Sequence, residues 1–238
     1  MHLILPARLD SQRLHRKMLA DVGGLPLVVR TLRRAQAVPG AATVTVATDD
    51  DAIAEVVRAH GGEVVRTGLH ASGTERVAEA ARVLARANPD LRKDIVVNVQ
   101  ADEPFLDVAQ VVAVAQAARS PGVDLATAAA PLDDAEANHP ARVKVVTDDE
   151  GRALYFSRAA IPHGGPFRVH VGLYAFRYEV LQRVATRVRP EPHPLEASER
   201  LEQLRWLAAG LRIAVVDVTH AGRSVDTAED LAWARARA

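Results

Sequence analysis

The sequence predicts an α/β fold, a doubly wound and mostly parallel sheet with an antiparallel insert. In the first 130 residues, short apolar or β-branched runs alternate with helix-length runs, which is typical of βαβ units. From about residue 140 to 180, strand patterns instead follow one another through turns, as in antiparallel hairpins. No linker or repeat interrupts the 238 residues. We therefore expect one domain, 1–238, with a β-rich insert at about 140–180.

The first half of the chain supplies the parallel units. A short apolar run before Arg8 is typical of a buried strand, and Pro26 suits the first turn of the helix that follows. The acidic run after Thr48 can cap the next helix. Further strands are expected at 42–47, 63–67, 95–100 and 125–130, and helices at 52–60, 72–87 and 108–118.

The second half changes character. Strands at 142–147 and 153–157 flank a turn that contains Gly151, and 170–176 is another strand. Helices are expected at 178–186 and 195–209, followed by a strand at 212–218 and a terminal helix at 227–237. Thr227 and Asp230 have the spacing of a capping box variant at the start of that last helix.

Composition excludes several classes of protein. Thirty basic residues balance thirty acidic ones, and aromatic content is 4%, so neither nucleic acid nor a membrane surface is an expected partner. The absence of cysteine excludes disulfides and a thiol nucleophile, and the histidines lack zinc-like spacing. No run approaches 18 apolar residues, and the first residues lack the layout of a signal peptide. A cytoplasmic location is the expectation.

A basic loop follows the first strand. Arg8, Arg13, Arg16 and Lys17 lie within ten residues, against one acid, Asp10. Open α/β sheets bind ligands beyond the carboxyl ends of their strands, which is where this loop would lie. Four cations favour an anion such as a polyphosphate. A solvated basic loop is the alternative.

Two carboxylates are candidate metal ligands. Asp102 ends a strong strand pattern and could hold Mg²⁺, which prefers one or two carboxylates together with substrate phosphates. Asp226 follows the last strand and could be the second ligand. The alternatives are a turn or a helix cap for Asp102, and a helix cap for Asp226.

Three further patterns each allow two interpretations. Ser72 and Glu75 form an S-x-x-E capping box, but the same helix start would present N–H groups and Arg76 to a ligand. His170 and Tyr174 share one strand face and form either a recess or a core pair. A polar stripe on one helix face is either solvated surface or a contact for a polyhydroxylated substrate; it comprises Glu196, Glu199 and Gln203.

These patterns occur together with other short motifs along nearly the whole chain. They include Leu5-Pro6-Ala7-Arg8, Ser72-Gly73-Thr74-Glu75-Arg76, Asn98-Val99-Gln100-Ala101-Asp102-Glu103-Pro104, His170-Val171-Gly172-Leu173-Tyr174 and Val225-Asp226-Thr227. In this order and at this spacing, the sequence resembles the nucleotide-sugar cytidylyltransferases that activate 3-deoxy-manno-octulosonate (Kdo) with CTP. The resemblance implies a Rossmann-like nucleotidyltransferase that transfers CMP to the sugar acid and releases pyrophosphate.

The resemblance also implies roles for individual residues. Arg8, Arg13 and Lys17 would hold the CTP phosphates, and with Asp102 they would form the catalytic set. Ser72 and Arg76 would contact the nucleotide, and Asp102 and Asp226 would bind Mg²⁺. The sugar-acid pocket would be lined by Gln100, Arg158, His170, Tyr174, Glu199 and Gln203. A homodimer built from the insert is also implied, with the strand that contains Tyr155 and Phe156 at the contact.

Two departures from the family pattern bear on the site. His15 and Arg16 replace the proline and glycine usual in the phosphate loop, and Ala101 replaces a glycine before Asp102. A methyl group at position 101 would clash if the backbone there needed positive φ. The alternatives are a different nucleotide, another sugar acid such as 8-amino-Kdo or a sialic acid, or a non-catalytic nucleotide-binding protein. Whether the product feeds lipopolysaccharide or another polymer is open.

Overall fold

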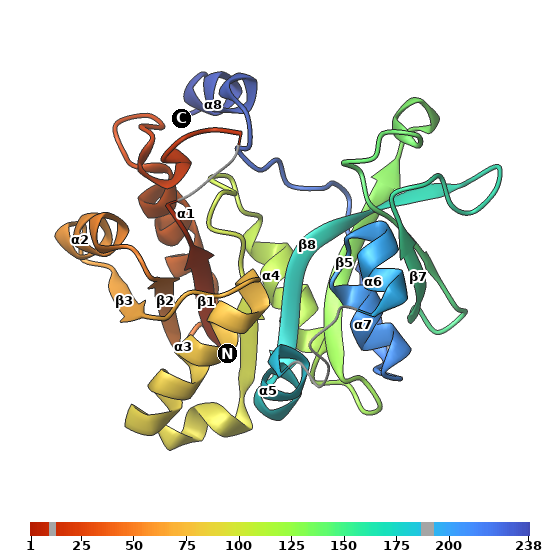
Figure 1. Ribbon diagram of the computed structural model, residues 1–238, viewed down its shortest axis with the longest axis horizontal. Helices are drawn as coiled ribbons and strands as arrows, with labels where there is room; N and C mark the ends of the chain where they lie inside the picture. Colours follow the sequence, from red (N-terminus) through yellow and green to blue (C-terminus); the bar gives the residue numbers. More distant parts are fainter. Residues whose placement is uncertain (10–12, 187–192) are drawn as a thin grey trace. The chain divides into compact units, whose positions relative to one another are not determined.

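The computed structural model describes residues 1–9, 13–186 and 193–238 (Figure 1). The chain divides into two compact units. Unit 1 contains Met1–Val112 and Gly222–Ala238, and unit 2 contains Ala113–Ala221. The expectation of a single domain stays a prediction. Among the described residues, no helix combines the length and apolar character needed to cross a bilayer.

Unit 1 is built on four parallel strands in the order β3-β2-β1-β4. All four residues of β4 are buried, which is typical of a strand covered on both faces. The strands are β1 (His2–Ala7), β2 (Thr43–Thr48), β3 (Glu63–Arg66) and β4 (Ile95–Asn98).

Helices connect these strands and cover both faces of the sheet. The chain moves outward from β1 to β3 and then returns across β1 to β4. Because such crossovers are right-handed, the first two helices lie on one face and the third on the other. The helices are α1 (Leu27–Gln36), α2 (Asp51–Ala59) and α3 (Gly73–Ala87), with α4 (Val108–Ala117) following β4. Short 3₁₀ turns occur at η1 (Lys17–Leu19) and η2 (Pro89–Lys93).

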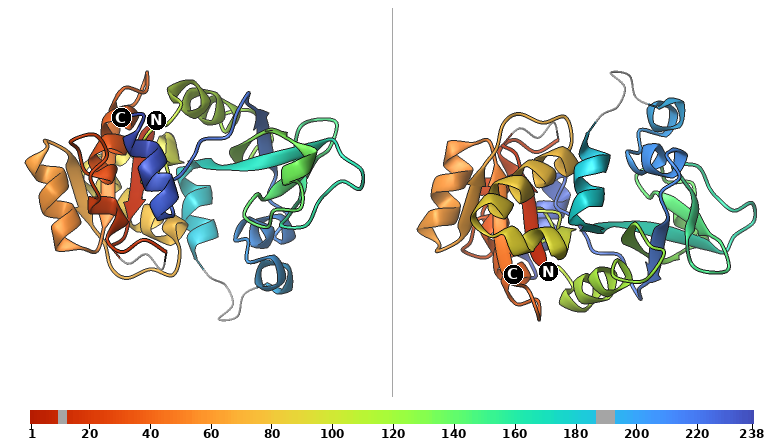
Figure 2. Two further views of the ribbon diagram at one scale, coloured as in Figure 1. Left: turned by 90° about the horizontal axis from the view of Figure 1, so that it is seen from above. Right: turned by 90° about the horizontal axis from the view of Figure 1, so that it is seen from below.

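The last helix, α8 (Ala228–Arg235), returns to the N-terminal segment of the chain. Val225 and Leu231 pack with Val22 and Leu27 in one buried cluster. Figures 1 and 2 show this helix, in blue, beside the red segment that follows β1. The C-terminal helix therefore packs on the segment that follows β1, and this contact brings Asp226 toward the basic loop.

Unit 2 contains the antiparallel part of the fold. β5 (Leu125–Leu132) pairs parallel with β9 (Ile213–Asp217) and antiparallel with β8 (Phe167–Arg177). β6 (Lys144–Thr147) pairs antiparallel with β7 (Ala153–Ser157) and with β8. The helices are α5 (Tyr178–Ala185), α6 (Pro194–Glu199) and α7 (Gln203–Ala208), with a 3₁₀ turn at η3 (Asp134–Glu136). The predicted α/β class, with its antiparallel portion, is confirmed.

The prediction of one helix at 195–209 is wrong, because this stretch forms two helices, α6 and α7. Arg200 has φ 55° and ψ 47°, a left-handed conformation that ends α6. The carbonyl oxygens of Glu199 and Arg200, which would accept bonds in a continuous helix, instead accept hydrogen bonds from the Arg158 guanidinium. The predicted single face of Glu196, Glu199 and Gln203 therefore does not exist.

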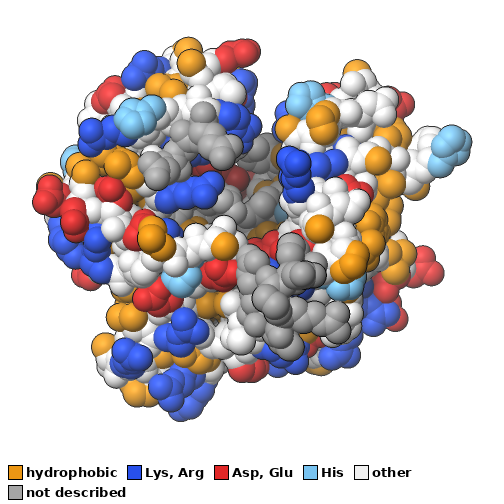
Figure 3. Space-filling model, viewed as in Figure 1, with side chains coloured by type: hydrophobic (Ala, Val, Ile, Leu, Met, Phe, Trp, Pro, Cys, Tyr) orange, Lys and Arg blue, Asp and Glu red, His pale blue; other side chains and the backbone are white. Residues whose placement is uncertain are grey.

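Three helix starts follow the predicted capping chemistry. Asp50 accepts from the N–H of Ile53 at 2.9 Å, and Ser72 accepts from the N–H of Glu75 at 3.2 Å. Thr227 and Asp230 form a full capping box at α8. On the face shown in Figure 3, basic and acidic side chains are interspersed, which agrees with the zero net charge.

Candidate active site

Lys17 lies between the two predicted metal carboxylates. Its ammonium nitrogen is 2.6 Å from Asp102 Oδ2 and 2.8 Å from Asp226 Oδ1. Arg13 Nη2 also lies 3.0 Å from Asp226 Oδ1. The Lys17 side chain is only 10% exposed. Burial alone would lower the pKa of its ammonium, but the pairing with Asp102 and Asp226 outweighs burial and raises it.

The backbone holds the two carboxylates together. The N–H of Val225 donates to the carbonyl oxygen of Asp102 at 2.9 Å, which joins the segment after β4 to the segment before α8. Asp230 fixes the other side of Asp226. Its Oδ2 accepts from the N–H of Asp226 at 3.2 Å and from the N–H of Thr227 at 3.0 Å.

Neither carboxylate is a helix cap, so the cap alternative is wrong for both, whereas Asp102 does lie in a turn. Thr227 is the N-cap of α8, and Asp226 directs its carboxylate to Lys17 and Arg13. Asp107, rather than Asp102, accepts from the N–H of Ala109 at the start of α4, at 2.9 Å.

A pocket of about 480 Å³ surrounds this cluster in unit 1. It is lined by every residue of unit 1 that the sequence analysis placed in the site. These are Arg8, Arg13, Lys17, Ser72, Arg76, Gln100, Asp102 and Asp226. The basic loop, the start of α3 and the end of β4 therefore contribute to one pocket, although their individual roles stay predictions.

The two departures from the family pattern have different structural outcomes. Arg16 has φ 51° and ψ 32°, a left-handed conformation in which glycine carries no steric cost. Apart from glycines, only Arg16 and Arg200 have positive φ in the described part of the chain. Ala101 is buried with ordinary backbone, so its methyl group meets no conformational penalty.

Arg76 is buried and already paired in its position at the pocket wall. Its Nη1 lies 3.0 Å from Asp49 Oδ1 and donates to Thr67 Oγ1 at 2.7 Å. Thr67 follows β3 and Asp49 follows β2, so Arg76 joins the starts of α2 and α3 to the ends of two strands. These contacts add a positioning role to the predicted nucleotide contact.

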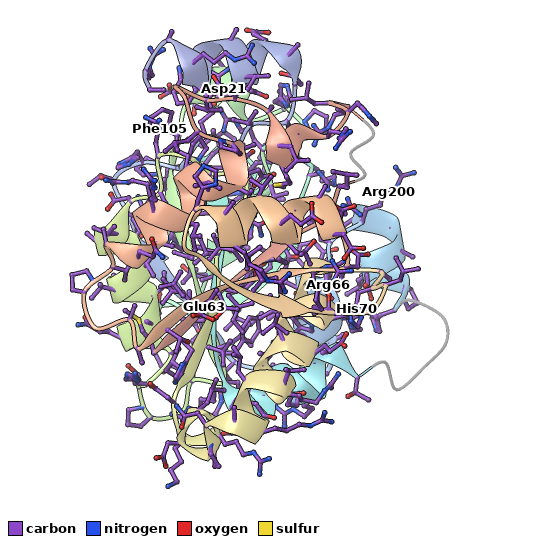
Figure 4. The ribbon with its side chains drawn as sticks, turned by 90° about the vertical axis from the view of Figure 1, so that its left-hand side faces the viewer. Asp21, Glu63, Arg66, His70, Phe105 and Arg200 are labelled. Carbon is purple, nitrogen blue, oxygen red and sulfur yellow. The ribbon has the colours of Figure 1, made fainter. Side chains whose placement is uncertain are left out.

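His70 also lines the pocket, and the sequence analysis missed it (Figure 4). Its Nε2 pairs with Glu79, which also accepts from the N–H of Gly68 at 3.0 Å. Burial would raise the pKa of Glu79, but the hydrogen bonds from His70 and Gly68 lower it. The sequence signal that could have placed His70 in the pocket is its position, two residues before the Ser72 cap.

Glu103 follows Asp102 and has an unusual titration. Burial, with a further contribution from the charge of Asp102, raises its pKa to about 7. A Cβ atom on Gly222 would lie 2.9 Å from Glu103 Oε2. Glycine at this position therefore allows the 222–226 segment to approach the carboxylate.

The predicted sugar-acid residues other than Gln100 belong to unit 2, where two hydrogen bonds join Arg158 to Glu199. Glu199 accepts from Ser157 Oγ at 2.6 Å and from the N–H of Arg158 at 2.8 Å. Arg158 Nε donates to the Glu199 carbonyl at 2.8 Å, and its Nη1 donates to the Pro140 carbonyl at 2.9 Å. Three of the five guanidinium N–H groups of Arg158 thus donate to carbonyls, including that of Arg200.

Lys144 is fully buried beside this network. Its ammonium donates to the carbonyls of Arg142 at 2.5 Å, Arg158 at 2.6 Å and His139 at 3.3 Å. Burial lowers the pKa of Lys144, and the charge of Glu199 opposes this effect.

His170 and Tyr174 are brought together on β8, with ring centroids 5.3 Å apart. Phe156 meets His170 edge-to-face at 5.1 Å, and Trp206 meets Tyr174 edge-to-face at 5.3 Å. Burial lowers the pKa of His170 to about 3 and raises that of Tyr174. The two rings are part of an aromatic cluster, as the core-pair alternative expects. Gln203 is buried at the start of α7.

The donor set in unit 1 fits Mg²⁺. The positions of Asp102 Oδ2 and Asp226 Oδ1 allow both oxygens to contact one cation, because both contact the Lys17 ammonium. Two carboxylates plus substrate phosphates are a common Mg²⁺ site. No group of three or more histidine or acidic side chains suited to a metal occurs among the described residues, so protein ligands alone would not complete the coordination.

Comparison with known proteins agrees with this geometry. Residues 2–213 match the family model described as cytidylyltransferase. The chain is 47% identical to the 3-deoxy-manno-octulosonate cytidylyltransferase of Nitrobacter winogradskyi, over 98% of this chain and 92% of the relative. The chain belongs to the 3-deoxy-manno-octulosonate cytidylyltransferase family. The predicted family and enzyme class, a nucleotidyltransferase, are therefore confirmed.

Other members and structures agree with this assignment. The cytidylyltransferase of the same name from Anaeromyxobacter dehalogenans is 47% identical over 98% of this chain and 96% of its own length. The structure of CMP:2-keto-3-deoxy-manno-octonic acid synthetase complexed with CTP matches with a TM-score of 0.90 and 37% identity, covering 99% of this chain and 97% of that one. A 4-diphosphocytidyl-2C-methyl-D-erythritol synthase from Anaerococcus prevotii shares the fold, with a TM-score of 0.67 and 14% identity over 99% of this chain and 97% of that one.

Proposed function

We propose that this cytidylyltransferase transfers CMP from CTP to Kdo in a Mg²⁺-dependent reaction. The sugar's anomeric hydroxyl oxygen forms a bond to the α-phosphorus of CTP, the bond from that phosphorus to the β-phosphate oxygen breaks, and pyrophosphate leaves. The hydroxyl proton is released to solvent. The observation that carries this proposal is the pocket in unit 1, where cations and two carboxylates meet around Lys17.

The residues of unit 1 act mainly by binding and charge compensation. Arg8, Arg13 and Lys17 would hold the triphosphate and offset the charge that develops on the leaving pyrophosphate. Ser72 and Arg76, at the start of α3, would contact the nucleotide. No covalent intermediate is needed, because phosphoryl transfer of this type depends on positioning and electrostatics.

Asp102 and Asp226 would hold Mg²⁺. When bound, the ion would polarise the α-phosphate and lower the pKa of the sugar hydroxyl. Asp230 and the hydrogen bond from Val225 to Asp102 would keep the two carboxylates in place.

In unit 2, Arg158 would recognise the carboxylate of the sugar acid, and in unit 1, Gln100 stays a predicted sugar contact. Three N–H groups of Arg158 donate to carbonyls, so binding the sugar carboxylate would use the other two. Glu199 would orient Arg158 through its backbone N–H. His170, Tyr174 and Gln203 complete the proposed set.

The proposed homodimer would use the insert. β7 pairs with β6 alone among the described strands, and Leu154 on it is 60% exposed, whereas its neighbour Phe156 is fully buried. On the predicted strand, Leu154 rather than Phe156 is therefore the side chain available for a contact. Light scattering of the wild type and of Leu154→Asp tests this; a monomeric wild type would reject it. The cytoplasmic location stays a prediction.

The reaction is tested with CTP, Mg²⁺ and a panel of 2-keto sugar acids, with pyrophosphate release as the readout. We expect turnover with Kdo and none after removal of Mg²⁺. Faster turnover with 8-amino-Kdo or a sialic acid would change the substrate assignment. If CTP binds but no sugar acid in the panel causes release of pyrophosphate from it, the protein is non-catalytic.

A further inference from the structure

Lys17 occupies the position that a bridging cation would need. Its ammonium contacts one oxygen of each carboxylate, Asp102 Oδ2 and Asp226 Oδ1. A Mg²⁺ ion binds such oxygens at about 2.0–2.1 Å. An ammonium and a divalent ion on the same two oxygens would repel each other at close range in a partly buried site. The two cations therefore compete.

The position of Lys17 is fixed by its surroundings. Lys17 is the first residue of the η1 turn. In this turn, the N–H of Leu19 donates to the Arg16 carbonyl at 2.9 Å and the N–H of Ala20 donates to the Lys17 carbonyl at 3.0 Å. Met18, the next residue, is 4% exposed. This contact is unlike a mobile surface ion pair, whose geometry is weakly held.

Charge balance shows what would release Lys17. In the structure, the charges of Asp102 and Asp226 are balanced by those of Lys17 and Arg13. A divalent ion added alone would leave two excess positive charges on this cluster of four side chains. A triphosphate brings the negative charge that offsets them, and Lys17 lines the same pocket as Arg8 and Ser72.

We propose that Lys17 couples nucleotide binding to metal binding. Its ammonium holds Asp102 and Asp226 and excludes a divalent cation until the triphosphate draws it away, which exposes both oxygens to the metal. This inference rests on the proposed function, because it takes both carboxylates as metal ligands. It assigns to Lys17 a second role besides holding phosphate.

The test measures two binding reactions of the full-length protein separately. The first is Mn²⁺ without nucleotide, followed by electron paramagnetic resonance, and the second is CTP in EDTA, followed by calorimetry. Lys17→Met should bind Mn²⁺ alone about tenfold more tightly than the wild type, within the range of typical coupling energies. The same variant should bind metal-free CTP more weakly. A merely structural role of Lys17 would weaken both.

Matched variants separate the possible outcomes. Lys17→Arg keeps the charge and should resemble the wild type, and Lys93→Met removes an exposed cation elsewhere in unit 1 and should leave both affinities unchanged. Lys17→Gln is a second neutral variant should Lys17→Met fail to fold. Equal Mn²⁺ affinity in Lys17→Met, Lys17→Gln and the wild type would overturn the exclusion, and unchanged metal-free CTP affinity would overturn the coupling.

A further pair of variants tests the metal site itself. If Asp102→Asn and Asp226→Asn lose Mn²⁺ binding while Lys17→Met gains nothing, only the role of Lys17 is wrong. If neither asparagine substitution changes Mn²⁺ binding, whether it is made in the wild type or in Lys17→Met, the metal assignment in the proposed function is wrong.

Discussion

The N–H of Val225 donates a hydrogen bond to the carbonyl oxygen of Asp102, at 2.9 Å. This backbone contact joins the two stretches of sequence that form unit 1, and the two carboxylates lie beside Lys17. Since the contact is between backbone atoms, substitution of either carboxylate side chain should leave it intact. The fold and the chemistry of the site can therefore be tested separately.

The first prediction concerns turnover. Asp102→Asn and Asp226→Asn should each abolish the release of pyrophosphate from CTP in the presence of Kdo, because each removes a charged ligand for the metal. Circular dichroism and thermal unfolding should show that both variants fold. Near-normal kcat in either variant would remove that residue from the metal site.

The second prediction concerns Asp230, which positions Asp226 through its backbone. Asp230→Ala should lower the affinity for Mn²⁺ by about tenfold, as loss of a residue that orients a metal ligand typically does. It should also lower stability by about 1 kcal/mol, because the capping box that Asp230 forms with Thr227 is lost. Asp50→Ala removes a cap from α2 and is the matched control. Equal effects of the two variants on metal affinity would contradict the positioning role.

The third prediction concerns Lys144, whose ammonium serves three carbonyls in unit 2. Lys144→Met should lower the free energy of unfolding by about 3 kcal/mol, because several buried carbonyls lose their donor. Denaturant unfolding measures this change. Lys93→Met, at an exposed site, should change stability by no more than about 0.5 kcal/mol. A stable Lys144→Met protein would show that other donors replace the ammonium.

The fourth prediction concerns pH. Thr127 Oγ1 lies 2.8 Å from the Leu173 carbonyl and 3.0 Å from His170 Nε2. Its one proton serves the carbonyl, so the Thr127 oxygen accepts the hydrogen bond and His170 Nε2 donates it. The folded pKa of His170 is about 3, below the ordinary value of 6.5. Between these values the unfolded chain binds the extra proton at His170, so the contribution of this residue to stability falls by up to about 1.4 kcal/mol per pH unit as the pH drops below about 6.5. Glu103, with its pKa raised to about 7, contributes in the opposite sense over part of this range.

This pH effect is measured by denaturant unfolding between pH 4 and 8. His170→Gln removes the titrating group. In this variant, the free energy of unfolding should fall less on acidification than it does in the wild type. His60→Gln, at an exposed position after α2, should leave the slope unchanged. An unaltered slope in His170→Gln would show that other groups cause the acid sensitivity.

The fifth prediction concerns Arg16 in its left-handed conformation. Arg16→Gly should raise the free energy of unfolding by up to about 1 kcal/mol, because the relief of backbone strain exceeds the entropy that glycine adds to the unfolded chain. Arg33→Gly, at an exposed site within α1, should instead lower it by about 1 kcal/mol. Destabilisation by both variants would show that the Arg16 side chain stabilises the loop.

The sequence alone determined the order of most elements, three helix caps and the meeting of the basic loop with Asp102. These features depend on local periodicity, on short-range capping chemistry and on the rule that parallel strands present their carboxyl ends at one edge. Asp102 and the basic loop follow neighbouring strands, β4 and β1. Their meeting was therefore predictable without knowledge of the packing.

The tertiary structure decided the features that depend on contacts between distant segments. At the break at Arg200, the Arg158 guanidinium binds carbonyls that a continuous helix would use, and the sequence pattern of 195–209 contains no sign of this distant contact. The pairing of Lys17 with Asp102 and Asp226 likewise depends on how α8 packs on the N-terminal segment. Residue type predicted a cation and two carboxylates, but only the packing showed that the cation lies between them.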